Sequence, residues 1–288
     1  MQKGATMLAD YHVHTEFSDD SVFALEDVCA LAIERGIDEI CITDHVDYDV
    51  RPDWDEYRRD PSCAKIFEGK LSINVDYERY FPAIEAARER FAPMLAVKTG
   101  MEFGVQSHTA ERFHALFEQH ADAWDFIILS IHQVGNEEFW NGTFQKGRTQ
   151  DEYNMQYYEE MLRVVQRFDD WSVLGHLDLI KRYDAAGPWP DENARDIVAE
   201  IMKEAIRRGK GIELNTSSIR YGLSDLTPSE DILRLYRDLG GRILSIGSDS
   251  HKPEHLGAHI PMMRERLQAI GFTEFCTFDH MEPVFHRL

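Results

Sequence analysis

Seven short apolar runs, rich in β-branched residues, alternate along this chain with segments of helical periodicity. The runs cover residues 8–14, 39–45, 95–102, 126–132, 171–176, 211–215 and 243–251. A continuous apolar run bounded by turn signals is typical of a strand buried on both faces. Strands that alternate with helices predict parallel βα units. The chain has 288 residues, a length that α/β barrels commonly fill as one domain, so we expect a single domain over residues 1–288.

The segments between the runs have the period and the ends of amphipathic helices. They cover residues 25–35, 76–91, 109–119, 151–168, 192–208, 229–239 and 253–269. Glycine follows several of them directly, as at Gly36, Gly209, Gly240 and Gly271, and glycine is the residue that most often ends a helix. We expect residues 272–288 to pack as a short cap.

Residues that can bind a metal lie where the apolar runs end. Six of the thirteen histidines are in these places, together with two carboxylates: His12, His14, His45, His132, His176, His251, Glu102 and Asp249. A strand in a core gains nothing from a terminal histidine. Because the carboxyl ends of parallel strands meet at one mouth of a barrel, we expect these side chains to form a single site.

The overall composition excludes some functions. The chain carries 31 basic and 52 acidic residues, a formal net charge of −21, which disfavours nucleic-acid binding through Lys and Arg contacts to phosphates. The four cysteines show no CxxC pairing, so buried thiols are expected rather than disulfides. No basic leader with an apolar stretch opens the chain, and no run approaches ~18 apolar residues. We therefore expect a soluble, cytoplasmic protein.

Two segments without helical period are long. Residues 46–75 follow the second run and carry an acidic cluster at residues 47–56, and residues 133–150 follow the fourth run. Long loops in a compact domain are usually functional. Both segments start at the rim where the ligand-type residues lie, so we expect them to be lids or walls of a substrate site.

The order of the short motifs resembles that of the polymerase and histidinol phosphatase (PHP) superfamily of metal-dependent phosphoesterases. The motifs are HVH at residues 12–14, TDH at 43–45, GME at 100–102, SIH at 130–132, GH at 175–176 and SDSH at 248–251. The resemblance covers residues 8–260. It implies a distorted seven-stranded (β/α) barrel, TIM-like, with its metal site at the C-terminal mouth of the strands.

The resemblance also implies two or three divalent ions. One would be held by His12, His14 and Asp249, and Glu102 would bridge it to a second ion on His132 and His176. A third would take Asp20, His45 and His251, with Asp19 as the alternative to Asp20. Mixed imidazole and carboxylate ligands suit Zn, Mn or Fe.

Such ions favour hydrolysis of phosphate esters. They neutralise the phosphoryl oxygens and lower the pKa of a coordinated water from ~15.7 toward ~7. The expected catalytic residues are Asp249, His251 and Glu102, and either Asp249, His251 or a coordinated water would protonate the leaving group. Asp44 is either an orienting neighbour of His45 or a plain turn residue.

Basic residues at the same rim favour a phosphate-bearing substrate. Lys181 and Arg182 follow His176, and Arg220 follows Asn215. Arginine matches phosphate oxygens with a planar fork and lysine offers a point charge. These segments are similar to the histidinol-phosphatase branch of the superfamily. That branch implies a small-molecule substrate, L-histidinol phosphate, which is hydrolysed to L-histidinol and inorganic phosphate in histidine biosynthesis.

Two alternatives remain at this point. One is a PHP-type phosphoesterase for nucleotides or DNA 3′ ends, which the acidic composition disfavours. The other is a module that binds metal or phosphate without catalysis. The histidines outside the motifs are expected at the surface or without a metal partner: His108, His114, His120, His255, His259, His280 and His286.

Overall fold

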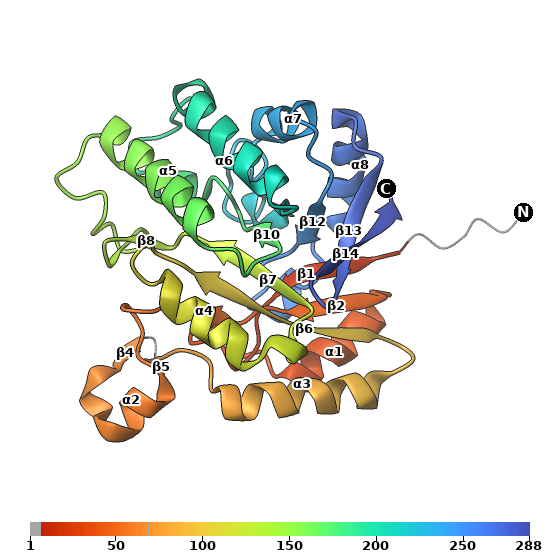
Figure 1. The fold of residues 1–288 in the computed structure, drawn as a ribbon. Coiled ribbons are helices and arrows are strands. Elements are labelled where there is room, and N and C mark those ends of the chain that lie inside the picture. Colours follow the sequence, from red (N-terminus) through yellow and green to blue (C-terminus); the bar gives the residue numbers. More distant parts are fainter. Residues whose placement is uncertain (1–6, 68) are drawn as a thin grey trace, which may run out of the picture.

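Seven parallel strands form the centre of the molecule in the computed structural model, which describes residues 7–67 and 69–288 (Figure 1). They are β1 (Ala9–Val13), β2 (Glu39–Ile42), β6 (Ala96–Gly104), β7 (Phe126–Ser130), β10 (Val173–Leu174), β11 (Gly211–Asn215) and β12 (Leu244–Gly247). Their residues are almost all buried because helices cover them from outside. Each strand overlaps one of the predicted runs, and six lie within them, whereas β6 continues two residues past the run over residues 95–102.

The strands follow one another around the sheet in chain order, and the first lies beside the last. Val13 forms a parallel bridge with Ser250. The His14 amide donates to the Ser250 carbonyl at 2.9 Å, and the Ser250 amide donates to the His12 carbonyl at 3.2 Å. This contact between β1 and β12, the seam of the barrel, is short. The pairing of β1 with β2 also shifts register between Asp10 and Val13. The result is the distorted, nearly closed seven-stranded barrel that was predicted.

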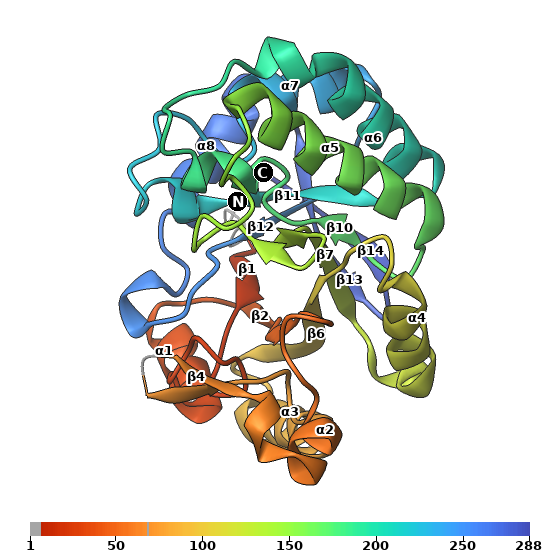
Figure 2. The ribbon, with the colours of Figure 1, turned by 90° about the vertical axis from the view of Figure 1, so that its left-hand side faces the viewer.

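Helices surround the strands (Figure 2). They are α1 (Leu25–Glu34), α3 (Tyr77–Phe91), α4 (Ala110–Gln119), α5 (Gln150–Arg167), α6 (Arg195–Arg207), α7 (Glu230–Asp238) and α8 (Ile260–Ile270). Local sequence sets several helix starts. Thr149 and Glu152 form a capping box at α5, and the Ser229 hydroxyl accepts from the Ile232 amide at α7.

The helix expected over residues 253–269 is wrong at its start. Residues Pro253–His255 form a 3-10 turn, η6, and α8 begins only at Ile260. Gly257 and His259 between them have left-handed backbone, with φ of +65° and +64°. A left-handed residue cannot continue a right-handed helix, so His255 and His259 do not share a helix face.

Both long segments contain short elements of their own. Residues 46–75 hold α2 (Trp54–Arg59) and the hairpin β4 (Lys65–Phe67) and β5 (Lys70–Ser72), and they follow β3 (His45–Val46), which pairs with β6. Residues 133–150 hold the hairpin β8 (Gln133–Val134) and β9 (Glu137–Glu138). The remaining 3-10 turns are η1 (Pro61–Cys63), η2 (Ala121–Ala123), η3 (Leu179–Tyr183), η4 (Asp191–Ala194) and η5 (Thr216–Ser218).

The C-terminal residues form an antiparallel hairpin, β13 (Glu274–Asp279) and β14 (Glu282–Arg287), at the N-terminal end of the barrel. Phe278 packs there against Phe126, with ring centroids 4.7 Å apart, and its amide donates to the Tyr11 hydroxyl at 2.7 Å. The hairpin therefore fills the end of the barrel opposite the predicted metal residues.

The thiols are free, as the spacing of the cysteines indicated. Cys29, Cys41 and Cys276 are buried, and Cys63 is exposed. None of the helices within residues 7–67 and 69–288 is long and apolar enough to cross a lipid bilayer.

Candidate metal centre

The nine predicted ligands gather at the C-terminal mouth of the barrel. Six strands supply them, either on the strand itself or in the loop that follows it: His12, His14, Asp20, His45, Glu102, His132, His176, Asp249 and His251. Residues that lie up to 239 positions apart in the chain thus share one cup. Parallel strands explain this convergence, because all of their carboxyl ends point the same way.

Glu102, at the end of β6, is the centre of the cup. Its Oε2 lies 3.1 Å from His12 Nε2 and 3.2 Å from His45 Nδ1. Its Oε1 lies 3.0 Å from His132 Nε2 and 2.8 Å from His176 Nε2. The carboxylate therefore faces four imidazoles at once, a geometry that suits a ligand shared between two cations.

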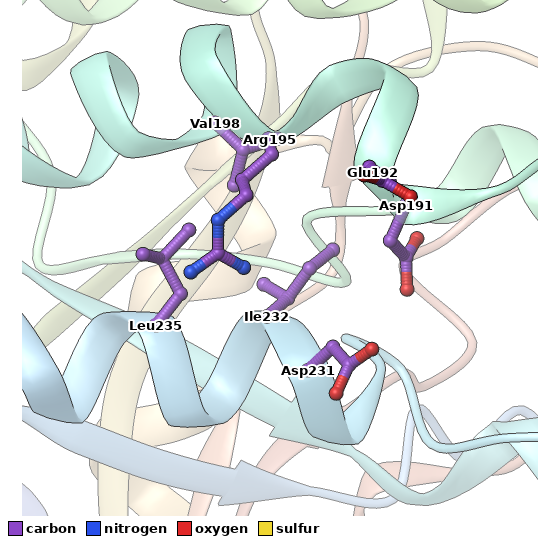
Figure 3. Close-up of a pocket in the computed structure, with 7 residues that line it drawn as sticks. All are labelled: Asp191, Glu192, Arg195, Val198, Asp231, Ile232 and Leu235. Carbon is purple, nitrogen blue, oxygen red and sulfur yellow. The ribbon is translucent and has the colours of Figure 1, made fainter.

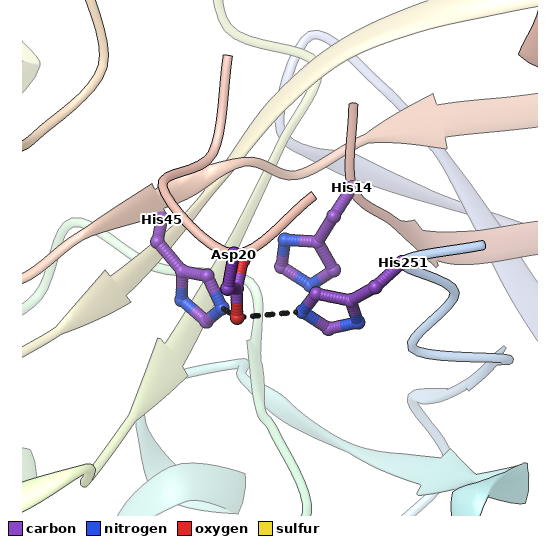
Figure 4. A group of neighbouring side chains, drawn as sticks. All are labelled: His14, Asp20, His45 and His251. Carbon is purple, nitrogen blue, oxygen red and sulfur yellow. Dashed lines mark ion pairs between the residues drawn. The ribbon is translucent and has the colours of Figure 1, made fainter. Parts of the chain in front are cut away.

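Two further groups lie on either side of Glu102. In the first, Asp249 Oδ1 is 4.0 Å from His12 Nε2 and 3.7 Å from His14 Nε2. The second contains Asp20, His45 and His251, with His14 beside them (Figure 4). Ligand atoms within each group lie no more than 4.8 Å apart.

Asp20 and its neighbour Asp19 have different surroundings. Asp20 Oδ2 lies 3.0 Å from His251 Nε2 and 3.4 Å from His45 Nε2 (Figure 4). Asp19 turns the other way and accepts hydrogen bonds from Arg51 Nε at 2.6 Å and from the Ser72 hydroxyl at 2.9 Å. The geometry favours Asp20 over Asp19 as the member of this group.

The pKa shifts in the cup keep Glu102 ionised and leave at least one imidazole neutral. Burial raises the pKa of Glu102, but His12, His132 and His45 outweigh it and hold that pKa well below its usual range. Burial and the neighbouring His251 and His45 lower the pKa of His14 well below 6.5. Ionised carboxylates and neutral imidazoles are the forms that bind metals.

An orphaned donor atom supports the fit of a metal. His14 is fully buried, and its Nε2 has no hydrogen-bond partner among the residues that the structure describes. An unpaired buried polar atom costs about 1–3 kcal/mol, a cost that a bound cation would remove. The surrounding imidazole and carboxylate donors suit Zn, Mn or Fe.

A cavity of about 570 Å³ opens above the cup. Besides ligand-type residues, its walls hold cations from several elements and aromatic side chains from the loops: Arg51, Lys65, Arg182, Arg220, Lys252, Trp140, Tyr183 and Tyr221. Residues of both long segments line it, as expected for substrate walls. Basic side chains concentrated here, in a chain of net charge −21, make the cavity suitable for an anion.

The two arginines expected to bind phosphate lie side by side. Arg182 Nη2 is 3.1 Å from Asp249 Oδ2, and Arg220 Nη2 is 3.4 Å from the same oxygen. The Tyr221 ring lies against both, 4.1 Å from Arg182 Cζ and 5.1 Å from Arg220 Cζ. Both guanidinium groups therefore face the edge of the cup next to Asp249.

Lys181 and Asn215 lie elsewhere, contrary to expectation. The Lys181 ammonium pairs with Asp178 at 2.8 Å and with Asp191 at 2.5 Å, because the η3 turn points it away from Arg182. Asn215 is fully buried and holds the backbone amide of Ser217 at 3.0 Å. Neither residue is among those that line the cavity.

The acidic cluster of residues 47–56 is also engaged in internal contacts. Asp47 accepts from Arg51 Nη1 at 2.9 Å, and Asp49 accepts from Arg112 Nη1 at 2.6 Å.

Asp44 accepts from the Thr15 amide and from the Ser18 hydroxyl, so it orders the loop after β1 rather than contacting an imidazole.

Two carboxylates that touch predicted ligands were not assigned a role from the sequence. Glu213 Oε1 lies 2.6 Å from His12 Nδ1, and Asp47 Oδ1 lies 2.8 Å from His132 Nδ1. A signal for Glu213 existed, since a charged residue in the middle of an apolar run is expensive unless it has partners. No such signal marks Asp47 among its acidic neighbours.

The histidines outside the motifs lie away from the cup, with one exception. His108 and His114 are exposed, and His120 is half-buried and stacks on Phe81 with centroids 4.2 Å apart. His255 lines the cavity, although it belongs to none of the groups that could hold a metal. His280 is grouped with Asp125 and Asp279 at the opposite end of the barrel.

A second pocket, of about 320 Å³, lies between α6 and α7 (Figure 3). Arg195 reaches into it from α6, while Asp191, Glu192 and Asp231 stand near one end. The described residues that line it include no histidine or cysteine. Its carboxylates belong to none of the groups of described residues that could hold a metal ion.

Comparison with known proteins shows the family to which the chain belongs. The PHP domain model matches residues 10–217. The chain is 30% identical to the histidinol-phosphatase of Lactococcus lactis over 281 residues, 95% of each chain. It is 27% identical to a probable histidinol-phosphatase of Thermotoga maritima, over 98% of this chain and all of that one.

Two solved structures resemble this chain in fold. The crystal structure of the Lactococcus lactis histidinol phosphate phosphatase, complexed with zinc, L-histidinol and phosphate, superposes with a TM-score of 0.81 at 27% identity, over 96% of this chain and 98% of that one. A putative histidinol phosphatase from Listeria monocytogenes has the same fold, with a TM-score of 0.71 at 19% identity, over 88% of this chain and 99% of that one.

Proposed function

The chain belongs to the PHP domain family, and we propose that it is a metal-dependent phosphomonoesterase that hydrolyses L-histidinol phosphate to L-histidinol and phosphate. This reaction belongs to histidine biosynthesis. The observation that carries the proposal is the pairing of a cup of nine ligand-type residues with two arginines at its rim. The relative with zinc, L-histidinol and phosphate in its crystal structure supports the choice of ester.

Two or three divalent ions, Zn, Mn or Fe, belong in the cup. His12, His14 and Asp249 would hold one, Glu102 with His132 and His176 would hold a second, and Asp20, His45 and His251 would hold a third. The short distances around Glu102 and the orphaned His14 Nε2 support this set. When bound, such ions neutralise phosphoryl oxygens and make water acidic enough to attack at neutral pH.

The arginines bind and orient the phosphate. Arg182 and Arg220 converge on Asp249 Oδ2. A phosphoryl group next to Asp249 takes over these donors, and a guanidinium fork matches its oxygens. The phosphorus is thereby held at the rim, with the ester oxygen toward the cavity.

The departing alcohol needs a proton. Asp249 and His251 both line the cavity, and either would relay to the alcohol the proton that the attacking water gives up. His251 Nε2 lies 3.0 Å from Asp20 and its Nδ1 lies 3.0 Å from the Asp249 carbonyl, so its ring is held from both sides.

The cationic end of the substrate meets Glu138 on β9. This carboxylate lines the cavity outside the ligand set, with 21% of its side chain exposed, and lies 3.7 Å from Arg51. Trp140 lines the cavity two residues further on.

Assays of the purified, metal-loaded protein against a panel of phosphate monoesters test the proposal. We expect L-histidinol phosphate to be hydrolysed with the highest kcat/KM. Activity confined to other esters would refute the substrate and leave the chemistry intact. Release of nucleotides from a labelled oligonucleotide at a comparable rate would instead favour the nucleic-acid alternative.

A further inference from the structure

Glu213, in the middle of β11, is fully buried in the barrel next to the cup. Its Oε1 lies 2.6 Å from His12 Nδ1. Its Oε2 accepts from the His176 amide at 2.8 Å and from Asn215 Nδ2 at 3.1 Å. An imidazole that donates Nδ1–H to a carboxylate keeps the lone pair on Nε2. His12 Nε2 is the atom that faces Glu102.

Asp47, just after β3, holds a second imidazole in the same way. Its Oδ1 lies 2.8 Å from His132 Nδ1, and its Oδ2 accepts from Arg51 Nη1 at 2.9 Å. The Asp47 amide donates to Asn74 Oδ1 at 2.8 Å, which fixes the backbone as well. His132 Nε2 again points to Glu102, at 3.0 Å.

Glycines make room for both carboxylates. A Cβ added at Gly247, at the end of β12, would lie 2.5 Å from Glu213 Oε1. A Cβ added at Gly104, at the end of β6, would overlap Asp47 Oδ1. Neither glycine is among those with positive φ, so space rather than backbone conformation requires glycine at these two strand ends.

Other buried carboxylates near the cup have different partners. Asp10 accepts from the Ser248 amide and hydroxyl, and Asp44 accepts from Thr15 and Ser18. These two hold backbone segments together. Glu213 and Asp47 differ from them, because each contacts Nδ1 of a ligand-type histidine, the ring nitrogen that points away from Glu102.

We propose that Glu213 and Asp47 are positioning residues that fix His12 and His132 with Nε2 toward the metal ions. The inference rests on the proposed function, because it takes both histidines to be ligands. It adds a second layer of carboxylates on two sides of the cup. Loss of such an outer partner typically weakens metal binding by roughly 10- to 100-fold.

The test is zinc binding by the full-length chain, stripped of metal and titrated in competition with a chromophoric chelator. In Glu213→Gln, a single amide oxygen remains to accept from the three donors that contact Glu213. In Asp47→Asn, an NH2 group, which is a donor, replaces one carboxylate oxygen. We expect each to weaken zinc binding by roughly 10- to 100-fold. In the zinc-loaded wild type, imidazole ¹⁵N resonances of His12 and His132 should show protonated Nδ1 and metal-bound Nε2.

A buried carboxylate at the opposite end of the barrel is a matched control. Glu39 accepts from the Tyr11 hydroxyl and belongs to none of the groups of described residues that could hold a metal. Glu39→Gln should lower the unfolding midpoint and keep wild-type zinc affinity.

Unchanged zinc affinity in Glu213→Gln and Asp47→Asn would overturn the proposal, as would an equal loss in the Glu39→Gln control. If Glu213→Gln does not fold, Asp47→Asn alone decides. Because no ester is present, a wrong substrate assignment leaves these results unaffected. A wild-type chain that does not bind zinc would refute the ligand set itself.

Discussion

Replacing Gly247 by alanine tests whether the seam of the barrel and the metal cup depend on the same few atoms. Gly247 ends β12, which lies next to β1 across the seam. The added methyl group would lie 2.5 Å from Glu213 Oε1 and overlap the Cβ of His12. Carbon atoms pack best at about 3.5–4.0 Å, so β1 and β12 must separate by about an ångström.

The cost of that separation follows from what holds the seam. Overpacking of a well-packed core costs about 1–3 kcal/mol. Separation also loosens the two hydrogen bonds that join Ser250 to His12 and His14, each worth about 1 kcal/mol. We therefore expect Gly247→Ala to lower the free energy of unfolding by roughly 3–5 kcal/mol. His12 moves with β1, so zinc affinity falls as well.

Urea unfolding of the metal-free protein measures the first effect, and chelator competition measures the second. Gly209→Ala is the control. Gly209 has φ of +69° and nothing within 4 Å of an added Cβ, so the variant should cost only about 1–2 kcal/mol of backbone strain and leave zinc binding unchanged. If Gly247→Ala is no less stable than Gly209→Ala, or binds zinc as tightly as the wild type, the argument from the seam is refuted.

Three further predictions concern single side chains. His12→Ala should reduce kcat by more than the roughly 10- to 100-fold expected for loss of a residue that only contacts a metal ligand, and circular dichroism should show little loss of folded protein. His114 is exposed, so His114→Ala should leave kcat within twofold. Arg182→Gln and Arg220→Gln should each lower kcat/KM for the phosphate ester by roughly 10- to 150-fold, the worth of about 1.5–3 kcal/mol for a charged hydrogen bond; unchanged kcat/KM would exclude phosphate binding by that arginine. Burial lowers the pKa of His120, so the unfolded chain takes up this proton first and stability is lost as pH falls from about 6.5 toward the folded pKa. The stability of His120→Phe relative to the wild type, from urea unfolding between pH 5 and 7.5, should therefore rise as pH falls, and a constant difference would contradict this.

Much of the fold could be predicted because its signals are local. A buried strand such as β7 is a continuous apolar run in the sequence. The starts of α5 and α7 follow from the side chains that cap their N-termini. The break before α8 was missed. Gly257 gave a visible sign of it, but the left-handed backbone of His259 has no sequence signature.

The orientation of side chains in the loops could not be predicted. Lys181 and Arg182 are adjacent and equally basic, yet only Arg182 reaches the cavity, because the η3 turn directs the two residues to different sides. Asp19 and Asp20 differ in the same way: Asp19 is held by Arg51, and Asp20 faces the histidines. Spacing along the chain carries no information on such turns.

The sequence by itself determined the alternating strands and helices, the family, and the residue types that end each strand, because hydrophobic period and ligand chemistry are properties of short segments. Only the tertiary structure decided which carboxylates stand behind those ligands. Glu213 lies 201 positions from His12 along the chain. Their hydrogen bond exists because closure of the barrel brings β11 and β1 to the same mouth, with Gly247 leaving the space between them.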